Sequence, residues 1–459
     1  MTTTLQPDRG QPATTLHVLD AAGFDAWAQG RPEPARALLR AAKFSGKAGE
    51  VAPFPAGNAH EVAIGVADAG ALGIYDLAAA AEKLPAGTYR LGDAQPGAAA
   101  LGWLLVGYRF DRYRKQADGP GERVLLTTDP AGAEAARAEA VATFLVRDLV
   151  NTPAEDLGPA ELQAEAARVG EAHGATLTVT RGDRLAQEFP LIHAVGRAAA
   201  RGRESRLVEF EWGDPAHPRV AVIGKGVTFD TGGLDIKPAS GMRLMKKDMG
   251  GAAHALALAQ LIMGARLPIR LHLLLPLAEN SISGPALRPG DVVRARDGTS
   301  VEIHNTDAEG RLILADALVC ASEENPALIL DFATLTGAAR VALGPDLPAL
   351  FSDDEALADE WEAAGRRGDD PVWRLPLWAP YDEMLKSDIA DIANAHDGGM
   401  AGTITAALFL KRFVPAGVPW AHLDTFAWRP AAKPGRPKGG EALGLRSAWA
   451  MLRARFARG

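Results

Sequence analysis

The sequence contains a single cysteine, Cys320, among its 459 residues. One cysteine excludes a disulfide within the chain and a zinc site built from several cysteines, and it is typical of a reducing compartment. Long hydrophobic runs are also missing, because no stretch approaches the ~20 apolar residues that a membrane-spanning helix needs. The polar first 20 residues have no apolar stretch of signal-peptide length. From these absences we expect a soluble, cytoplasmic protein without a membrane partner.

A strong charge of either sign is absent as well. The formal net charge is −8, and 47 % of the residues are hydrophobic and 23 % charged, which is an ordinary globular composition. The mildly acidic balance argues against nucleic acid as the main partner. Because the chain is longer than one hydrophobic core normally supports, the sequence predicts about two domains.

The N-terminal part of the sequence indicates a small α/β domain without recognisable chemistry. Its first 20 residues mix Thr, Pro and Gln and are expected to form a loose lead-in. Strand patterns follow at residues 60–68 and 122–129, and helix patterns at residues 31–44, 75–84 and 131–150. Prolines interrupt the periodicity in NTPAEDLGPAEL (151–162). We therefore predict two domains, residues 1–155 with a linker helix near 131–150, and residues 156–459.

Beyond residue 160, strand patterns alternate with helix patterns. Strands are expected at residues 206–212, 219–226, 269–278, 300–305, 327–335 and 420–424. Helices are expected at residues 250–265, 311–323, 355–366, 402–413 and 442–456. This alternation predicts a larger C-terminal α/β domain with a mostly parallel sheet flanked by helices, in which sites form at the carboxyl ends of strands. Residues 428–441, rich in Pro, Gly and Lys, are expected to form a long surface loop.

Carboxylates and lysines follow these strands or stand in glycine-rich turns. VAVIGKGVTFDTGG (220–233) leads from a buried strand to Lys225 and Asp230, and Asp248 precedes a helix. Asp307 and Glu309 are two residues apart, which places them on the same face of an extended chain. Four carboxylates in one cleft repel one another unless cations neutralise them, and oxygen ligands favour Mg²⁺, Mn²⁺ or Zn²⁺. Two such ions sharing ligands drive hydrolysis through a bridging hydroxide.

Each of these patterns has a simpler interpretation when it is taken alone. Asp230 after a strand is often a turn former or helix cap, and NTDAEG (305–310) resembles an ordinary Asx-rich turn. Lys225 between two glycines is a weak signal for nucleotide binding, which would indicate a phosphotransferase. Periodicity does not show that these side chains meet in space.

Three motifs together resemble one family. GKGVTFDTGGLDIKP (224–238), KDMGGAA (247–253) and NTDAEGRL (305–312) closely resemble the motifs of the leucyl aminopeptidases, the hexameric two-metal enzymes of the cytosol. The likeness continues through residues 276–298, 331–344, 385–414 and 420–424, covers roughly the last 300 residues, and is weak before them. It implies an aminopeptidase that removes N-terminal residues, apolar and leucine-like, from short peptides. It also implies a homo-hexamer, and it leaves open a DNA-binding or scaffold protein on the same fold.

The resemblance assigns a role to each matching residue. Asp230 and Glu309 would bridge two divalent ions, with Mn²⁺ or Zn²⁺ favoured over Mg²⁺ or Co²⁺. Lys225 and Asp248 would complete the tighter site and Asp307 the more exchangeable one. The other implied roles are a carbonyl-polarising charge on Lys237, a bicarbonate ion as general base on Arg311, a bicarbonate and substrate pocket at Thr334, Leu335 and Gly337, and a first side-chain pocket at Met245.

The sequence departs from the family pattern in two places. Asp235 stands where the family usually has a small polar residue, so it adds negative charge near Lys237. Such a charge would shift metal affinity or pH dependence. After WAHLD the family continues with Ile-Ala-Gly, whereas this chain reads TFAWRPAAKPGRPKGGEALGLR (425–446). We expect a different loop near the pocket rim there, with an effect on residue preference.

Overall fold

The computed structural model describes residues 2–115, 121–396 and 398–457. It divides the chain into two compact units: unit 1 is residues 1–144 with 431–438, and unit 2 is residues 145–430 with 439–459. The division falls inside helix α5 (Pro130–Asn151), and the boundary predicted at residue 155 lies just beyond the end of that helix. In the described part of the chain, every helix is too short or too polar to cross a membrane.

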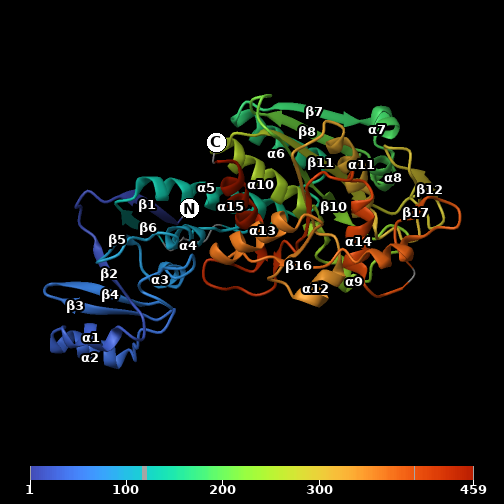
Figure 1. Cartoon of the computed structure of the whole chain (residues 1–459). Coiled ribbons are helices and arrows are strands. Elements are labelled where there is room, and N and C mark those ends of the chain that lie inside the picture. Colours follow the sequence, from blue (N-terminus) through green and yellow to red (C-terminus); the bar gives the residue numbers. More distant parts are fainter. Residues whose placement is uncertain (1, 116–120, 397, 458–459) are drawn as a thin grey trace. The chain divides into compact units, whose positions relative to one another are not determined.

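Unit 1 is built on a six-stranded sheet in the order β1-β6-β5-β2-β4-β3 (Figure 1). All neighbours are parallel except the antiparallel pair β3 and β4. Val62 and Ile64 face a core shared with α3 (Ala78–Lys83) and α4 (Ala99–Leu105), whereas Ala63 faces a second core with α2 (Glu33–Ala41). The strands are β1 (Thr3–Pro7), β2 (Thr14–Leu19), β3 (Val51–Ala56), β4 (Ala59–Gly65), β5 (Gly87–Leu91) and β6 (Arg123–Thr127), and α1 (Phe24–Gln29) completes the unit.

The expectation of a loose lead-in over the first 20 residues is wrong. Strand β1 pairs with β6, and β2 lies inside the sheet between β4 and β5. The segment contains few apolar residues, but Leu5 and Leu16 are both buried. Threonine, which dominates the segment, has a high preference for strands. Composition indicated a loop here, whereas sheet pairing decides the structure.

Unit 2 contains a nine-stranded sheet in the order β16-β15-β18-β14-β9-β11-β8-β7, with β10 paired to β11. The pairs that join β10, β11, β9, β14 and β18 are all parallel, and antiparallel pairing occurs only toward the two edges. The predicted α/β class with a mostly parallel sheet is confirmed. The strands are β7 (Thr176–Arg181), β8 (Arg206–Trp212), β9 (Arg219–Gly224), β10 (Gly226–Asp230), β11 (Arg270–Asn280), β14 (Leu328–Ala333), β15 (Ala349–Ser352), β16 (Trp373–Arg374) and β18 (Trp420–Asp424).

Helices cover both faces of this sheet. Helix α10 (Gly250–Gly264) packs on β9, β11 and β14 together with α6 (Pro159–Ala172) and α15 (Leu445–Phe456), and α13 (Glu355–Arg367) packs against α15. The opposite face carries a core built with α8 (Pro190–Gly196), α11 (Glu309–Ser322) and α14 (Gly402–Lys411). The remaining elements are α7 (Gly182–Glu188), α9 (Ala239–Met242), η1 (Met245–Met249), α12 (Gly337–Leu343), η2 (Ala379–Leu385) and a small sheet of β12 (Val292–Arg294), β13 (Ser300–Glu302) and β17 (Ile392–Ala393).

The long surface loop expected at residues 428–441 is only partly a loop. Its ends form the paired, buried strands β19 (Trp428–Arg429) and β20 (Gly439–Gly440). Its middle, residues 431–438, belongs to unit 1, where Gly435 N donates to Glu82 Oε1 at 3.0 Å. The Arg436 guanidinium lies 3.8 Å from the centre of the Tyr75 ring. Residues 430–434 are exposed, as Pro, Gly and Lys content indicated, but strand pairing at both ends and the contacts of Gly435 and Arg436 hold the segment in place.

Helix α10 approaches strand β9 so closely that side chains are excluded between them. A Cβ atom on Gly251 would lie 2.1 Å from Phe332 O and 2.8 Å from Lys225 N. A Cβ atom on Gly224 would lie 2.5 Å from Ala252 Cα. These glycines bring the start of the helix, and Asp248 just before it, against the carboxyl end of the strand.

Replacing Gly251 by alanine therefore forces two backbones apart. We expect Gly251→Ala to lower the free energy of unfolding by about 1–3 kcal/mol, because backbone atoms cannot move aside as a flexible side chain can. Gly264→Ala at the other end of the same helix is the matched control, since its nearest neighbour would be a His173 side-chain atom at 3.7 Å. The control should stay within about 1 kcal/mol of the parent. Urea unfolding followed by circular dichroism measures both, and equal effects would contradict this account.

Candidate active site

The predicted functional residues lie at one edge of the unit 2 sheet, where the parallel strands end. Lys225 follows β9, and Asp230 is the last residue of β10. Thr334 follows β14, and the neighbouring β18 ends at Asp424. Parallel strands end at the same edge of a sheet, so residues distant in the sequence meet there.

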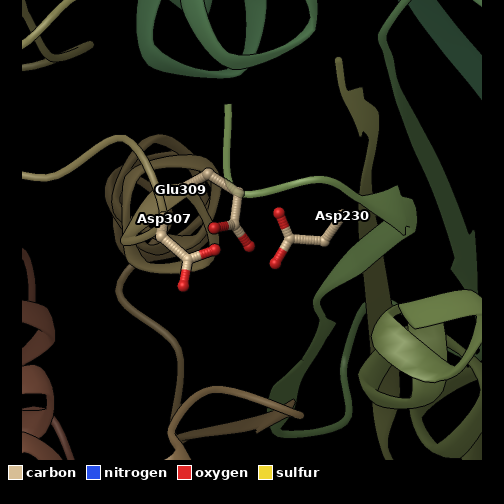
Figure 2. Close-up of side chains that lie close together, drawn as sticks. All are labelled: Asp230, Asp307 and Glu309. Carbon is tan, nitrogen blue, oxygen red and sulfur yellow. The ribbon is translucent and has the colours of Figure 1, made fainter. Parts of the chain in front are cut away.

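Three carboxylates converge at this edge. Asp230, Asp307 and Glu309 each offer an oxygen atom, and these atoms lie within 4.8 Å of one another. Figure 2 shows the side chains of Asp230 and Glu309 directed toward each other, with Asp307 beside Glu309. Asp230 and Glu309 are 2 % and 1 % exposed. The sequence-predicted cluster therefore forms, from the end of strand β10 (Asp230), the loop before α11 (Asp307) and the first turn of α11 (Glu309).

Two lysines lie among the carboxylates. Lys225 Nζ is 2.6 Å from Asp248 Oδ2 and 2.8 Å from Glu309 Oε1, so this lysine joins Asp248 to the cluster. Lys237 Nζ is 2.8 Å from Asp230 Oδ2 and also forms an ion pair with Asp307. The Lys225 side chain passes α11 at Gly310, where a Cβ atom would lie 2.6 Å from its ammonium nitrogen. Each lysine thus contacts carboxylates from two different segments.

A glycine turn after β10 makes room for this arrangement. Gly232 and Gly233 have φ angles of +88° and +65°, which residues with side chains rarely adopt. A Cβ atom on Gly232 would lie 2.9 Å from Asp307 Oδ1. The turn closes with Lys237 N donating to Thr231 O at 2.9 Å. It can therefore carry Lys237 back to the carboxylates and leave space for Asp307.

The carboxylates shift one another's acidity. Burial, followed by repulsion from Asp230, raises the pKa of Glu309 to about 8 and that of Asp307 to about 6. For Asp248, burial is outweighed by the lysines, chiefly Lys225, which hold its pKa at about 2. Burial alone would lower the pKa of Lys225 and of Lys237, but the surrounding carboxylates raise both above the ordinary lysine value. The cluster is a site in which negative charge is costly.

The donor atoms fit divalent cations. Glu309 Oε2 is buried and has no hydrogen-bond partner among the described residues. Carboxylate oxygens with one amine nitrogen form a donor set suited to hard or borderline cations such as Mg²⁺, Mn²⁺ or Zn²⁺. A buried carboxylate oxygen without a donor is costly unless an ion takes that place. The residues of this site therefore fit the metals that the sequence suggests.

Arg311 lies on α11, two residues after Glu309. It is 8 % exposed, and its Nη1 donates to Asn394 O at 2.7 Å. Its Nε atom is buried without a hydrogen-bond partner in the described part of the structure. Burial lowers the pKa of Arg311 to about 10, so the side chain stays charged near neutral pH. Arg311 is thus a buried cation whose Nε has no hydrogen-bond partner among the described residues.

The segment after β14 borders the same site. Thr334 Oγ1 donates to Asp248 Oδ1 at 2.8 Å, and Lys225 Nζ donates to Thr334 O at 3.3 Å. Leu335 follows it, and Gly337 is the first residue of α12. Met245 begins η1, three residues before Asp248, and is buried. Thr334 thus contacts the carboxylate cluster directly.

Sequence reasoning missed residues that hold these loops. Asn280 Nδ2 donates to Asp230 Oδ1 at 2.9 Å and to Thr306 O at 3.2 Å, and Asn280 is paired opposite Asp230 in the sheet. Asp424 Oδ1 accepts from Leu335 N at 2.9 Å, and its Oδ2 accepts from Thr336 Oγ1 at 2.6 Å. A polar residue at the end of an otherwise apolar strand is the signal that could have identified both.

Comparison with known proteins decides the family. The catalytic domain of the cytosol aminopeptidase family matches residues 144–448, and the M17 aminopeptidase N-terminal domain matches residues 14–125. The chain belongs to the cytosol aminopeptidase family. A probable cytosol aminopeptidase of Caulobacter vibrioides is 40 % identical over 444 residues, which are 89 % of each protein. The family resemblance read from the motifs is confirmed, and the chain is a metal-dependent aminopeptidase of the leucyl type.

Solved structures agree over nearly the whole chain. The crystal structure of the cytosol aminopeptidase from Coxiella burnetii has a TM-score of 0.93 and 43 % identity, and covers 98 % of this chain and 99 % of its own. A bottromycin maturation enzyme in complex with Mn has a TM-score of 0.86 and 36 % identity, and covers 96 % of this chain and 99 % of its own. The match includes the N-terminal region, where the motifs resembled the family only weakly.

Cation binding should release protons from this aminopeptidase. A carboxylate must be ionised and a lysine neutral to ligate a metal. Because the pKa of Glu309 is raised to about 8 and that of Lys225 lies above its ordinary value, both groups hold protons at pH 7 before binding. We expect cation affinity to increase as the pH rises toward 8. Calorimetric titration of the metal-free protein with Mn²⁺ in two buffers of different ionisation enthalpy counts the protons, and a pH-independent affinity without proton release would contradict the prediction.

Asp424 should support activity through the turn that follows β14. Asp424→Ala removes the acceptor for two backbone N–H groups and is expected to lower kcat/KM by roughly 10²-fold through misplacement of Leu335. Asp424→Asn should retain more activity because an amide oxygen still accepts. Asp353→Ala, which removes a half-exposed partner of Lys411, is the control and should leave kcat/KM unchanged. Full activity of Asp424→Ala would show that this turn does not depend on the carboxylate.

Proposed function

We propose that this aminopeptidase removes single residues, preferentially apolar and leucine-like, from the N-termini of short peptides with two divalent cations. The observation that carries the proposal is the buried Glu309, whose Oε2 has no hydrogen-bond donor among the described residues while its Oε1 lies 2.8 Å from Lys225 Nζ. Mn²⁺ and Zn²⁺ are the ions we favour, and Mg²⁺ or Co²⁺ would also suit these donors. A relative in this fold was solved in complex with Mn.

Five residues would hold the cations. Asp230 and Glu309 would bridge them, Lys225 and Asp248 would complete one site, and Asp307 the other. When bound, the pair would acidify a water molecule and so provide a nucleophile near neutral pH. The short distances from Lys225 Nζ to Asp248 and Glu309 support its place in the first site, because the amine already lies among the ligand oxygens.

Lys237 would stabilise the negative charge that develops on the scissile carbonyl oxygen. Its Nζ lies beside Asp230 and Asp307, and these carboxylates keep it protonated. A fixed ammonium group in a site that excludes water stabilises such charge far more than water does. Lys237 forms no backbone contact through Nζ among the described interactions, so the ammonium can turn toward a substrate oxygen.

Arg311 would hold a small anion such as bicarbonate, which would serve as general base. The support is a buried, charged guanidinium on the first turn of α11, close in sequence to Glu309, whose Nε has no partner in the part of the chain that the structure describes. The sequence and structure offer no further carboxylate for that role beyond the proposed ligands in the described site. A general base must lie within hydrogen-bond reach of the water that it activates.

The substrate would enter beside the segment after β14. Thr334, Leu335 and Gly337 would line the pocket, and Met245 would face the first side chain of the peptide. A free N-terminal amine of the substrate would bind one of the cations, which would explain a restriction to N-termini. We extend the proposal to a homo-hexamer in the cytoplasm, in which residues 156–459 carry the chemistry; the names of the relatives, which refer to the cytosol, support the compartment.

A panel of aminoacyl p-nitroanilides tests this proposal. The protein is stripped of metal with a chelator and assayed after addition of Mn²⁺, Zn²⁺, Co²⁺ or Mg²⁺, with N-acetyl-leucine p-nitroanilide as the blocked control. We expect activity only with metal, highest on leucine, and none on the blocked substrate. Lys237→Met should lower kcat by roughly 10²–10³-fold, as the loss of an oxyanion donor does.

Two variants distinguish the loss of a site carboxylate from the loss of any exposed carboxylate. Asp307→Ala should abolish most activity, whereas Asp297→Ala, an exposed turn aspartate that accepts from Thr299 N at 2.9 Å, should behave like the parent. Activity that ignores chelation and survives Asp307→Ala would remove the proposal. If the blocked substrate were cleaved as fast as leucine p-nitroanilide, a free N-terminus would not be required, and the protein would act as an endopeptidase rather than an exopeptidase.

A further inference from the structure

Two loops border the carboxylates that would hold the cations, and they meet at Thr306. The first loop, residues 231–237, lies between Asp230 and Lys237. The second, residues 305–308, carries Asp307 and ends at the start of α11. Thr306 is 2 % exposed, so its polar groups need partners within the protein.

All polar atoms of Thr306 are used to join the loops. Its hydroxyl donates to Gly232 O at 2.7 Å and accepts from Asp235 N at 2.9 Å. Its carbonyl accepts from Asn280 Nδ2 at 3.2 Å, and Asn280 also holds Asp230. Its backbone N–H donates to Asp235 Oδ2 at 2.7 Å. The carboxylate of Asp235 thus accepts the N–H of the Asn305–Thr306 peptide group, one residue before Asp307, and its Oδ2 also lies 3.1 Å from the Thr306 hydroxyl oxygen.

We propose that Asp235 is a positioning residue, a latch that fixes Asp307 against Asp230 by accepting the Thr306 N–H, and so sets the affinity for one of the two cations. This inference rests on the proposed two-cation site. Asp235 touches no cation ligand with its side chain. It acts through the peptide group that precedes Asp307 and through its own N–H on the Thr306 hydroxyl.

The geometry distinguishes a latch from a simple added charge. A charge acts over distance on both cations and on Lys237, whereas a hydrogen bond to one peptide group acts only on the loop that carries Asp307. Asp307 is the ligand that most needs such support, because its side chain is half-exposed whereas those of Asp230 and Glu309 are buried. Partners that orient metal ligands through hydrogen bonds typically change metal affinity about 10–100-fold when they are removed.

The test measures cation binding rather than activity. Metal-free full-length protein is titrated with Mn²⁺ by calorimetry and with Co²⁺ by visible absorption, in the parent, Asp235→Ala, Asp235→Asn and Asp214→Ala. Asp214 is the matched control, an exposed aspartate of unit 2 that accepts from Ala216 N at 2.8 Å in the turn between β8 and β9. Thermal unfolding of each metal-free variant verifies that it is folded.

We expect the parent and Asp214→Ala to bind two cations per chain with the same two affinities. Asp235→Ala should weaken one of them by at least about tenfold, change the Co²⁺ spectrum of that site, and leave the other affinity unchanged. Asp235→Asn retains an oxygen acceptor without the charge, so it should recover most of the affinity. If metal-free Asp235→Ala still unfolds cooperatively on heating, its weaker cation binding results from a displaced loop at residues 305–308 and not from unfolding of the protein.

Three results would overturn the latch. Asp235→Ala binding both cations as the parent does would show that the Thr306 contact is dispensable. Equal weakening in Asp235→Ala and Asp235→Asn would show that charge acts and the hydrogen bond does not. If the parent hydrolyses leucine p-nitroanilide only with metal, while the Asp235 variants bind both cations as the parent does, the latch alone is overturned. If the parent binds no cation, the proposed function is overturned together with the latch.

Discussion

The structure of the catalytic unit depends on concentrating negative charge where water is largely excluded. Asp230, Asp248, Asp307 and Glu309 face two lysines, so the protein alone leaves more carboxylates than ammonium groups, and burial together with this repulsion raises the pKa of Glu309. If two dications entered and Lys225 became neutral, the metals would balance the four carboxylates. Lys237 would then remain as the charge free to meet a developing oxyanion. Removing charge from either side of this balance changes the site as a whole, because each lysine contacts two carboxylates.

Such a concentration is possible because glycines, which have no side chain, border the cluster and the strands that carry it. Gly251 lies against Phe332 O and Lys225 N, Gly310 lies against the Lys225 ammonium, and Gly232 lies against Asp307. Each glycine occupies a place where a methyl group would collide with the site or with the strands that carry it. The parallel strands bring the site residues to one edge of the sheet, because their carboxyl ends share that edge. The glycines allow the segments that carry these residues to approach one another closely. Catalytic chemistry in this fold is therefore inseparable from helix-to-strand packing.

Much of the larger unit could be predicted from the sequence because its signals are local. Strands β8 and β18 begin and end where the apolar patterns do, and the helices that follow the motifs lie within a few residues of their predicted bounds. Lys225 interrupts the strand predicted at residues 219–226, because its backbone bonds to Phe332 O and to Ala252 N as the chain passes to β10. Strands β1 and β2 were not predictable, since their stability comes from partners far along the chain. For Asn280 and Asp424 a polar strand end marks the position in the sequence, but their partners are defined only after β10, β11, β14 and β18 are aligned.

Asp235 shows why a residue's charge does not by itself reveal its effect. From the sequence, an added carboxylate near Lys237 implies a change in the electrostatics of that lysine. In the structure its oxygen instead accepts from Thr306 N, while Lys237 pairs with Asp230 and Asp307. A surface carboxylate that accepts a backbone N–H from a buried residue influences loop geometry at short range, whereas solvent weakens its field on more distant groups. The effect of Asp235 is thus better explained by how it holds the loop that carries Asp307 than by how much charge it adds to the site.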